Sequence, residues 1–451
     1  MPPFRHWADL PPELLCLICD GLGLKSYVSS RGACTAWRCA LVPPTPSLLL
    51  VPDEDRCCPS AASLPMHRSF ALKPFPPGRP RVVGSSNGWL ALSIDSLTFS
   101  IFNPTTATEI ILPPLIYKGT WFSKSKLVFT PNPASDDFIA AAICDLDRLA
   151  YVTSGARRWA ILDPVPLARG DRLVDLVYHE NGKVYCLTFY GDVHVLLLPE
   201  RRRRKSILVE KPTAPLLSST EKPLQVRRPQ HQRCIRLTTA PPISVKLEPE
   251  PDLNAPATVE PLVSGGNLPF SPATCFAPPY NTLRTFTSAK NLVFCEGNLY
   301  QIWRNTSCRI TLHLPAGGGR RRLEDDEVFV LRYQPQRQPC WDVVTDLGGY
   351  SVFLGRNNAV SMYCQGVPGL KGNCVYWIGG RGRDQAMVFD MTTGRSTPCL
   401  PAAPWGAPQS TICWYFFSDV ENNCSNSRGE SVNHSVGVRA NPEKPQDSIE
   451  E

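Results

Sequence analysis

The sequence lacks an apolar run that could cross a bilayer. Its best candidate, Phe138 to Cys144, is far shorter than the ~18 residues that a membrane helix needs. The first residues, MPPFRHWADLPPEL, show no basic region followed by an apolar stretch, and we therefore expect no signal peptide. These absences predict a soluble intracellular protein, located in the cytoplasm, the nucleus or both.

Catalytic and cofactor motifs are also missing. No HExxH, GxSxG or P-loop pattern occurs, and the 7 histidines do not cluster with carboxylates or cysteines at ligand spacing. The one CxxC pair, Cys16 and Cys19, falls within an apolar helical pattern and has no second pair at metal spacing, so we interpret it as structural. We predict that the chain is not an enzyme, holds no metal and uses no cofactor.

Net charge and cysteine distribution argue against a protein with a broad nucleic-acid-binding surface and against a disulfide-rich secreted protein. The net charge is +7, but residues 200–236 alone carry 11 Lys/Arg against 3 Asp/Glu, so the basic character is local and does not predict a surface for nucleic acid. The 18 cysteines are scattered over a large chain without a secretory signal. We therefore interpret them as reduced thiols, many of them buried as small apolar groups.

Residues 1–42 have a helical pattern, although 46 prolines and 30 glycines argue against long helices elsewhere. Pro11, Pro12 and Glu13 suit the first turn of a helix. Apolar residues follow at helical spacing: Leu14, Leu15, Ile18 and Leu22. A second run places Cys34, Trp37 and Leu41 on one helical face. A unit this small buries its apolar faces poorly alone, so we expect it to have a partner.

The remainder predicts an all-β domain. Residues 43–80 are rich in proline and serine, and we predict a linker with little regular structure. From residue 81 the pattern changes to short alternating strands with tight turns such as Asn181-Gly182, and strand units recur along the chain. We predict a β-propeller built from residues 81–198 and 280–417.

An insertion interrupts the propeller pattern at residues 199–279. This span holds 15 prolines and the basic run Arg201, Arg202, Arg203, Arg204 and Lys205. We predict that the insertion and the polar tail at 418–451 are disordered. The basic run is a candidate nuclear import signal; the alternative interpretation is a solvated charge run, and without interleaved aromatics it does not predict base stacking.

The N-terminal segment WADLPPELLCLICDGLGLKSYVSSRGACTAWRCAL, residues 7–41, resembles the F-box, through Leu10-Pro11, the Glu13 to Leu15 run and the CxxWR ending. The resemblance implies a helical unit that docks on the Skp-type adaptor of a cullin-based ligase. It also implies an interface made by Leu10, Pro11, Leu14, Leu15, Ile18 and Trp37. Gly32 departs from the pattern because it stands where a bulkier residue is usual, inside a predicted helix.

Residues from about 82 to 417 resemble the KIB-type β-propeller that follows many plant F-boxes. The resemblance lies in ordered local segments: SNGWLAL, IFNPTTATEIILPPL, DRLAYVTSGARRW, DLVYHENGKVYCL, CWDVVTDLGGYSVFLGRNNAVSM, GLKGNCVYWI and VFDMTTGRSTPCLP. The long insertion departs from the family pattern and leaves the number of blades and the closure of the ring open.

The two resemblances together imply the substrate-recognition subunit of a Skp-cullin-F-box ubiquitin ligase. The helical unit would bind the adaptor, and through it a cullin, while the propeller holds a protein target for ubiquitination. The alternative is a propeller scaffold for protein interactions that does not engage a ligase. No loop in the sequence identifies the target.

Overall fold

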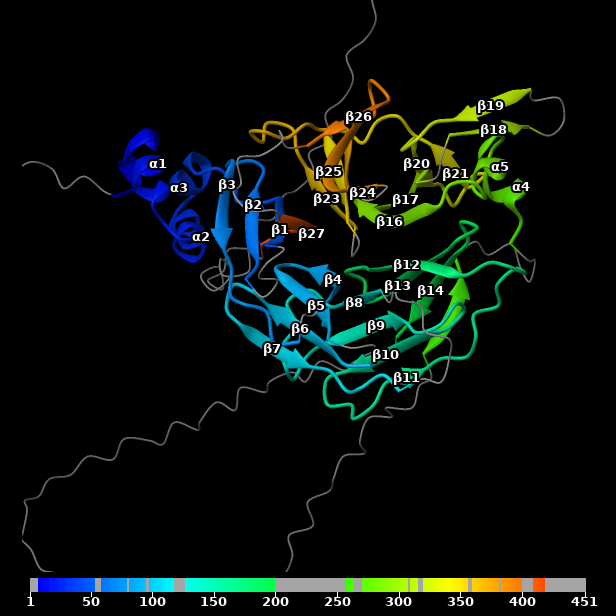
Figure 1. The fold of residues 1–451 in the computed structure, drawn as a ribbon, viewed down its shortest axis with the longest axis horizontal. Helices are drawn as coiled ribbons and strands as arrows, with labels where there is room; N and C mark the ends of the chain where they lie inside the picture. Colours follow the sequence, from blue (N-terminus) through cyan, green and yellow to red (C-terminus); the bar gives the residue numbers. More distant parts are fainter. Residues whose placement is uncertain are drawn as a thin grey trace, which may run out of the picture.

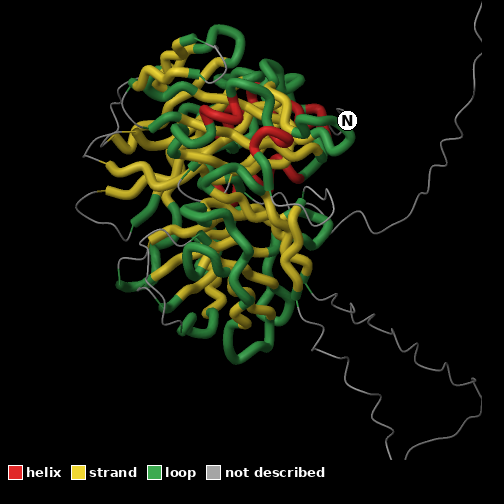
Figure 2. The backbone as a smooth tube through the Cα atoms, turned by 90° about the vertical axis from the view of Figure 1, so that its right-hand side faces the viewer, coloured by secondary structure: helices red, strands yellow, loops and turns green. Residues whose placement is uncertain are grey.

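Strands dominate the computed structural model, after a 3-10 turn and three short α-helices at its N-terminal end (Figures 1 and 2). The residues that the structure describes are 7–52, 58–78, 81–94, 97–116, 126–198, 257–262, 270–306, 309–314, 319–355, 359–380, 383–399 and 409–417. Within these ranges no helix is both long and apolar enough to span a bilayer.

The helices predicted within residues 1–42 are confirmed. They are the 3-10 helix η1 (Trp7–Asp9) and the α-helices α1 (Pro12–Asp20), α2 (Leu24–Gly32) and α3 (Thr35–Ala40). Gly32 is the last residue of α2 and not an interior one, so its cost to the helix is smaller than the sequence suggested.

The predicted propeller is also confirmed, and the described strands form six blades. Blade 1 contains β27 (Gln409–Tyr415), β1 (Ser47–Pro52), β2 (Ser60–Ser63) and β3 (Arg68–Ala71). Blade 2 contains β4 (Arg81–Ser86), β5 (Trp89–Ser93), β6 (Phe99–Asn103) and β7 (Thr108–Ile111). Blade 3 contains β8 (Leu127–Phe129), β9 (Ile139–Ile143), β10 (Leu149–Thr153) and β11 (Ala160–Ile161).

The second half of the ring has the same architecture with two additions. Blade 4 contains β12 (Leu173–Tyr178), β13 (Val184–Thr188), β14 (Val193–Leu197) and β15 (Thr258–Pro261). Blade 5 contains β16 (Ala289–Cys295), β17 (Asn298–Arg304), β20 (Val328–Tyr333) and β21 (Trp341–Val343), with the hairpin β18 (Ile310–His313) and β19 (Arg320–Leu323) inserted between β17 and β20. Blade 6 contains β22 (Tyr350–Leu354), β23 (Ala359–Tyr363), β24 (Cys374–Gly380), β25 (Arg383–Asp390) and β26 (Arg395–Pro398).

Blade 6 has five strands because β22 pairs in parallel with β24 and in antiparallel fashion with β23. The innermost strands of neighbouring blades contact one another in the order β27, β4, β8, β12, β16 and β23, and β25 contacts β27. Two one-turn helices, α4 (Pro272–Cys275) and α5 (Tyr280–Leu283), precede β16.

The core lies between the blades. Six apolar clusters are buried, and each combines side chains from two adjacent blades. Strand β1 shows how: Leu48 and Leu50 face blade 6, while Leu49 and Val51 face blade 2. A strand that is buried on both faces needs apolar side chains at every position, which explains the continuous run of β1.

The prediction of a linker at residues 43–80 was wrong, because this span supplies β1, β2 and β3 of blade 1. The prolines of this span do not interrupt its strands, because Pro52 is the last residue of β1 and Pro46, Pro59 and Pro65 lie outside the strands. Strand β1 pairs with β27, so the two ends of the propeller close the ring together. The Tyr415 hydroxyl of β27 also joins blade 1 to blade 2 by donating to the carbonyl of Gly88 at 2.7 Å.

The predicted insertion at 199–279 was too long at its C-terminal end. Strand β15 and helix α4 fall inside it, and β15 pairs with β14 as the fourth strand of blade 4. The insertion therefore connects β14 to β15. The rest of it, and the predicted disordered tail at 418–451, lie outside the described residues.

Candidate functional site: the exposed face of the N-terminal helices

Helix α1 is built as the sequence predicts. Pro11 precedes the first turn, where Pro12 leaves no amide donor unpaired, and Glu13 places a carboxylate near the positive end of the helix. The helix ends at Asp20, and Gly21 follows as the C-cap. The loop through Gly23 then turns the chain into α2.

The three helices enclose a small core of their own. Leu15, Cys19, Tyr27 and Leu41 are buried there, and Trp37 packs against them. The indole Nε1 of Trp37 donates to the carbonyl of Trp7 at 3.0 Å, which holds η1 against α3. Burial raises the pKa of Tyr27 to about 12. Its hydroxyl donates to the Val42 carbonyl at 2.8 Å, so the protonated form is also the one that bonds.

The opposite side of α1 is apolar and faces solvent. Leu14 is 49% exposed, Leu17 is 69% exposed and Ile18 is 51% exposed. Their i, i+3, i+4 spacing places them on one face of the helix. Trp7, which is 74% exposed, adds a large aromatic surface on η1. Nothing in the part of the chain that the structure describes covers this face.

The structure separates the six residues predicted to contact an adaptor. Leu14, Ile18 and Pro11 are exposed, and Leu10 and Trp37 are half-buried. Leu15 is only 1% exposed and belongs to the core of the helical unit, so it lies behind the exposed face, and contact of the six residues with an adaptor stays a prediction. Leu17 and Trp7 were not among the predicted contact residues, although Leu17 stands three residues after Leu14 and so shares its helical face.

The helical unit packs directly on blade 1. The Arg68 guanidinium donates through Nη2 to the carbonyl of Leu22 at 2.6 Å, and the same guanidinium lies over the Phe70 ring. Tyr27 contacts Phe70, and Met66 packs against the core of the helices. The strand pair β2–β3 thus forms the seat of the helical unit, so no free linker separates the two parts.

Two other features of the sequence were considered as sites: the Cys16 and Cys19 pair and the basic run Arg201 to Lys205. Cys19 is buried in the helical core, and the Cys16 thiol donates to the Ala40 carbonyl at 3.8 Å, so both cysteines serve packing. Within the described ranges no group of three or more His, Cys, Asp or Glu could hold a metal ion. The candidate import signal, Arg201 to Lys205, lies outside the described residues.

Comparisons with known proteins agree with this architecture. Residues 61–397 match the family model of the KIB1-4 beta-propeller. An F-box protein of Arabidopsis thaliana is 21% identical over 225 residues, which are 42% of this chain and 56% of that protein, so the chain spans little more than half the length of this curated relative.

Among solved structures, the WD40 domain of fission yeast SCAP aligns over 70% of this chain and 56% of that chain, at 10% identity and a TM-score of 0.27. PorZ of Porphyromonas gingivalis aligns over 81% of this chain and 38% of that chain, at 10% identity and a TM-score of 0.29. The fold assignment rests on the sheet order and on the family match. Because the family match covers most of its length, the chain belongs to the KIB1-4 beta-propeller family, and the similarity to the Arabidopsis thaliana protein supports a plant F-box protein with a KIB-type propeller.

Proposed function

We propose that this protein is the substrate-recognition subunit of a Skp-cullin-F-box ubiquitin ligase. The observation that carries the proposal is the uncovered apolar face of α1 on a unit whose own core is already complete. Fully burying one large apolar side chain is worth ~1.5–3 kcal/mol, so Leu14, Leu17 and Ile18 favour a protein partner over water. The Skp-type adaptor is the partner that the F-box resemblance implies.

The protein would act by holding its target and not by chemistry of its own. The helices bind the adaptor, and the propeller, which contacts them through Arg68 and Phe70, binds the target. Target lysines are then held near a ubiquitin-charged enzyme that another subunit carries. The gain in rate comes from effective concentration, which a fixed geometry between the two binding surfaces increases.

The test is a pull-down of the purified chain with a Skp-type adaptor and cullin. The variant Leu14→Asp plus Ile18→Asp places two unpaired carboxylates in the proposed interface, and we expect it to lose at least nine-tenths of the captured adaptor. The matched control is Ile111→Asp plus Ile116→Asp, the same chemical change at two residues that are 74% and 72% exposed. This control should bind as the wild type does.

Two results would count against the proposal. Either the wild type captures no adaptor, or the double variant captures as much as the control while its melting curve matches that of the wild type. In both cases the propeller would act as an interaction scaffold outside a ligase. Trp37 is left unchanged in this design, because its indole holds η1 and its loss would disturb the helical unit itself.

A further inference from the structure

The hairpin β18–β19 stands apart from the repeating architecture. It leaves blade 5 after β17, returns before β20, and forms a two-stranded sheet of its own. Figure 1 places it at the end of the molecule farthest from α1, α2 and α3. Neither the adaptor-facing helices nor the ring closure uses it, so its side chains need another explanation.

Strand register divides the hairpin into two faces. Ile310 lies opposite Leu323, and Leu312 lies opposite Arg321. Because side chains alternate along a strand, these four share a face, and the leucines bury it in the apolar cluster of blades 4 and 5. The other face carries the pairs Thr311 with Arg322 and His313 with Arg320, all four of them exposed.

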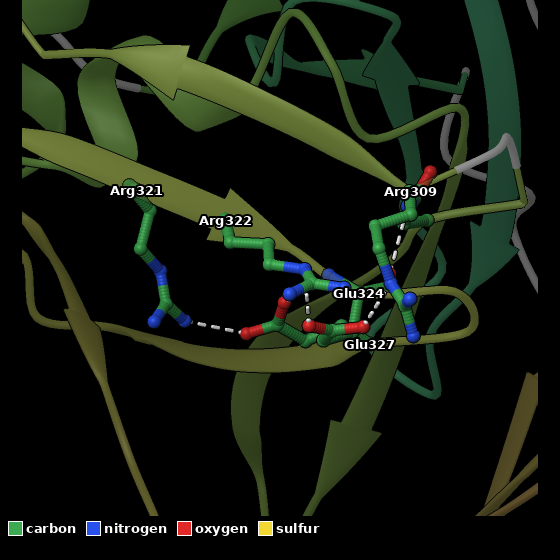
Figure 3. Close-up of polar contacts among 6 residues, drawn as sticks. Arg309, Arg321, Arg322, Glu324 and Glu327 are labelled. Carbon is green, nitrogen blue, oxygen red and sulfur yellow. Dashed lines mark hydrogen bonds and ion pairs between the residues drawn. The ribbon is translucent and has the colours of Figure 1, made fainter.

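The solvent-facing side is cationic. Arg309 pairs through Nε with Oε2 of Glu324 at 2.6 Å, and Arg322 pairs through Nε with Oε1 of the same carboxylate at 3.0 Å (Figure 3). One carboxylate therefore serves two arginines, and Arg320 adds a third guanidinium two residues from Arg322. Arg321 lies on the opposite face, beside Leu312, and pairs with Glu327 at 2.5 Å.

Charge and spacing indicate what this face would bind. The hairpin face carries three guanidinium groups and one carboxylate, an excess of positive charge at the sheet surface. Three more carboxylates follow Glu324 in the chain: Asp326 pairs with Arg304, Glu327 pairs with Arg321, and Asp325 lies in the turn after β19. Arg320 and Arg322 stand two residues apart on a strand, ~7 Å, which is also the spacing of alternate side chains in an extended peptide. Guanidinium groups bind carboxylates in a bidentate fashion, and arginine clusters are a recurring device for acidic motifs.

We propose that the face formed by Arg309, Thr311, His313, Arg320, Arg322 and Glu324, the arginine face, binds an acidic, extended segment of the target protein. The proposal rests on the proposed function, because it names the chemistry of the target that the propeller presents. Nucleic acid is less favoured, because the arginine face has no Phe, Tyr or Trp on which bases could stack.

Glu324 has a defined part in this site. Its carboxylate holds the side chains of Arg309 and Arg322 in place, and an incoming carboxylate must displace it. Removing its charge frees both guanidinium groups for the ligand. The affinity for an acidic peptide should therefore rise in Glu324→Gln, whereas it should fall when Arg320 and Arg322 lose their charge.

The experiment measures fluorescence anisotropy of a fluorescein-labelled octaglutamate peptide titrated with the full chain. Residues Arg201 to Lys205 are replaced by alanine throughout, so that this second basic run does not compete for the probe. We expect Arg320→Gln plus Arg322→Gln to weaken binding at least fivefold and Glu324→Gln to strengthen it at least twofold. The matched control is Arg157→Gln plus Arg158→Gln, the same change of net charge at two exposed arginines of blade 3.

The control pair should change the affinity by less than twofold, and all variants should melt like the parent. The proposal is overturned if the control weakens binding as much as the hairpin variant does, because net charge would then explain the effect. It is equally overturned if an octathymidylate probe binds as tightly and is lost in the same variant. Since the peptide assay contains no adaptor, its failure leaves the ligase proposal standing, and failed adaptor capture leaves this site standing.

Discussion

Asp175 shows at the scale of one residue how the propeller is held together near its axis. Its carboxylate forms a buried ion pair with Lys126, which precedes β8 of blade 3. The same carboxylate accepts the backbone N–H of Leu292 on blade 5 at 2.7 Å and that of Leu176 at 2.9 Å. One side chain of blade 4 therefore ties three blades. Burial lowers the pKa of Lys126.

Replacing Asp175 by alanine should destabilise the propeller severely. The change leaves Lys126 buried without a counter-charge and two amide donors without an acceptor, and breaking a buried pair costs about 3–5 kcal/mol. Urea denaturation followed by tryptophan fluorescence measures the loss. The exposed Asp136 provides the control, since Asp136→Ala should stay within about 0.5 kcal/mol of the wild type. A loss below about 1 kcal/mol for Asp175→Ala would show that the tie is unimportant.

The N-terminal helices show how far the sequence alone predicts which apolar residues are buried and which are exposed. Helical spacing selected Leu14 and Ile18 correctly as apolar residues of α1, but it could not separate the buried face from the exposed one. Leu15 was therefore included although it fills the helical core, and Leu17 was left out although it faces solvent. The distinction depends on where Tyr27, Leu41 and blade 1 lie, which is information that α1 does not contain.

Some strands of the propeller could be predicted from the local sequence pattern, and others could not. Alternation and the Asn87-Gly88 turn, where both residues have positive φ, made β4 and β5 easy to predict. Strand β1 was missed because it is apolar on both faces and lies among prolines. Its partner β27 is about 360 residues away in sequence, and no local pattern reports a pairing at that separation.

Strand β27 should be indispensable to the ring. It buries Trp414 against blade 6 and Cys413 and Tyr415 against blade 2, and its loss would also leave one edge of β1 unpaired. A chain truncated after residue 408 should lose its cooperative thermal transition or melt at least 10 °C lower. Truncation after residue 417 keeps β27 and is the control, with a melting temperature close to that of the full chain. Equal melting temperatures for the two truncations would contradict the role of this strand in closure.

The whole molecule is a ring with a helical unit fixed to one blade. The six inter-blade clusters make each blade depend on two neighbours, and blade 1 carries both the closure and the seat of the helices. The sequence predicted the two architectures but not their junction, because the linker interpretation separated what Arg68, Phe70 and Met66 join. The helices and the arginine face thus lie at opposite ends of one body (Figure 1).

This arrangement makes the apolar face of α1 the most direct point of test. Leu17 was not among the residues predicted from sequence, and it is the most exposed apolar side chain of α1, so its replacement leaves the helical core intact. The decisive measurement is a calorimetric titration of the purified chain with a purified Skp-type adaptor, comparing the wild type with Leu17→Asp. The account predicts saturable binding by the wild type and at least tenfold weaker binding by the variant, a change of about 1.4 kcal/mol, with an unchanged melting temperature. Absence of wild-type binding, or equal affinity of the two proteins, would contradict it.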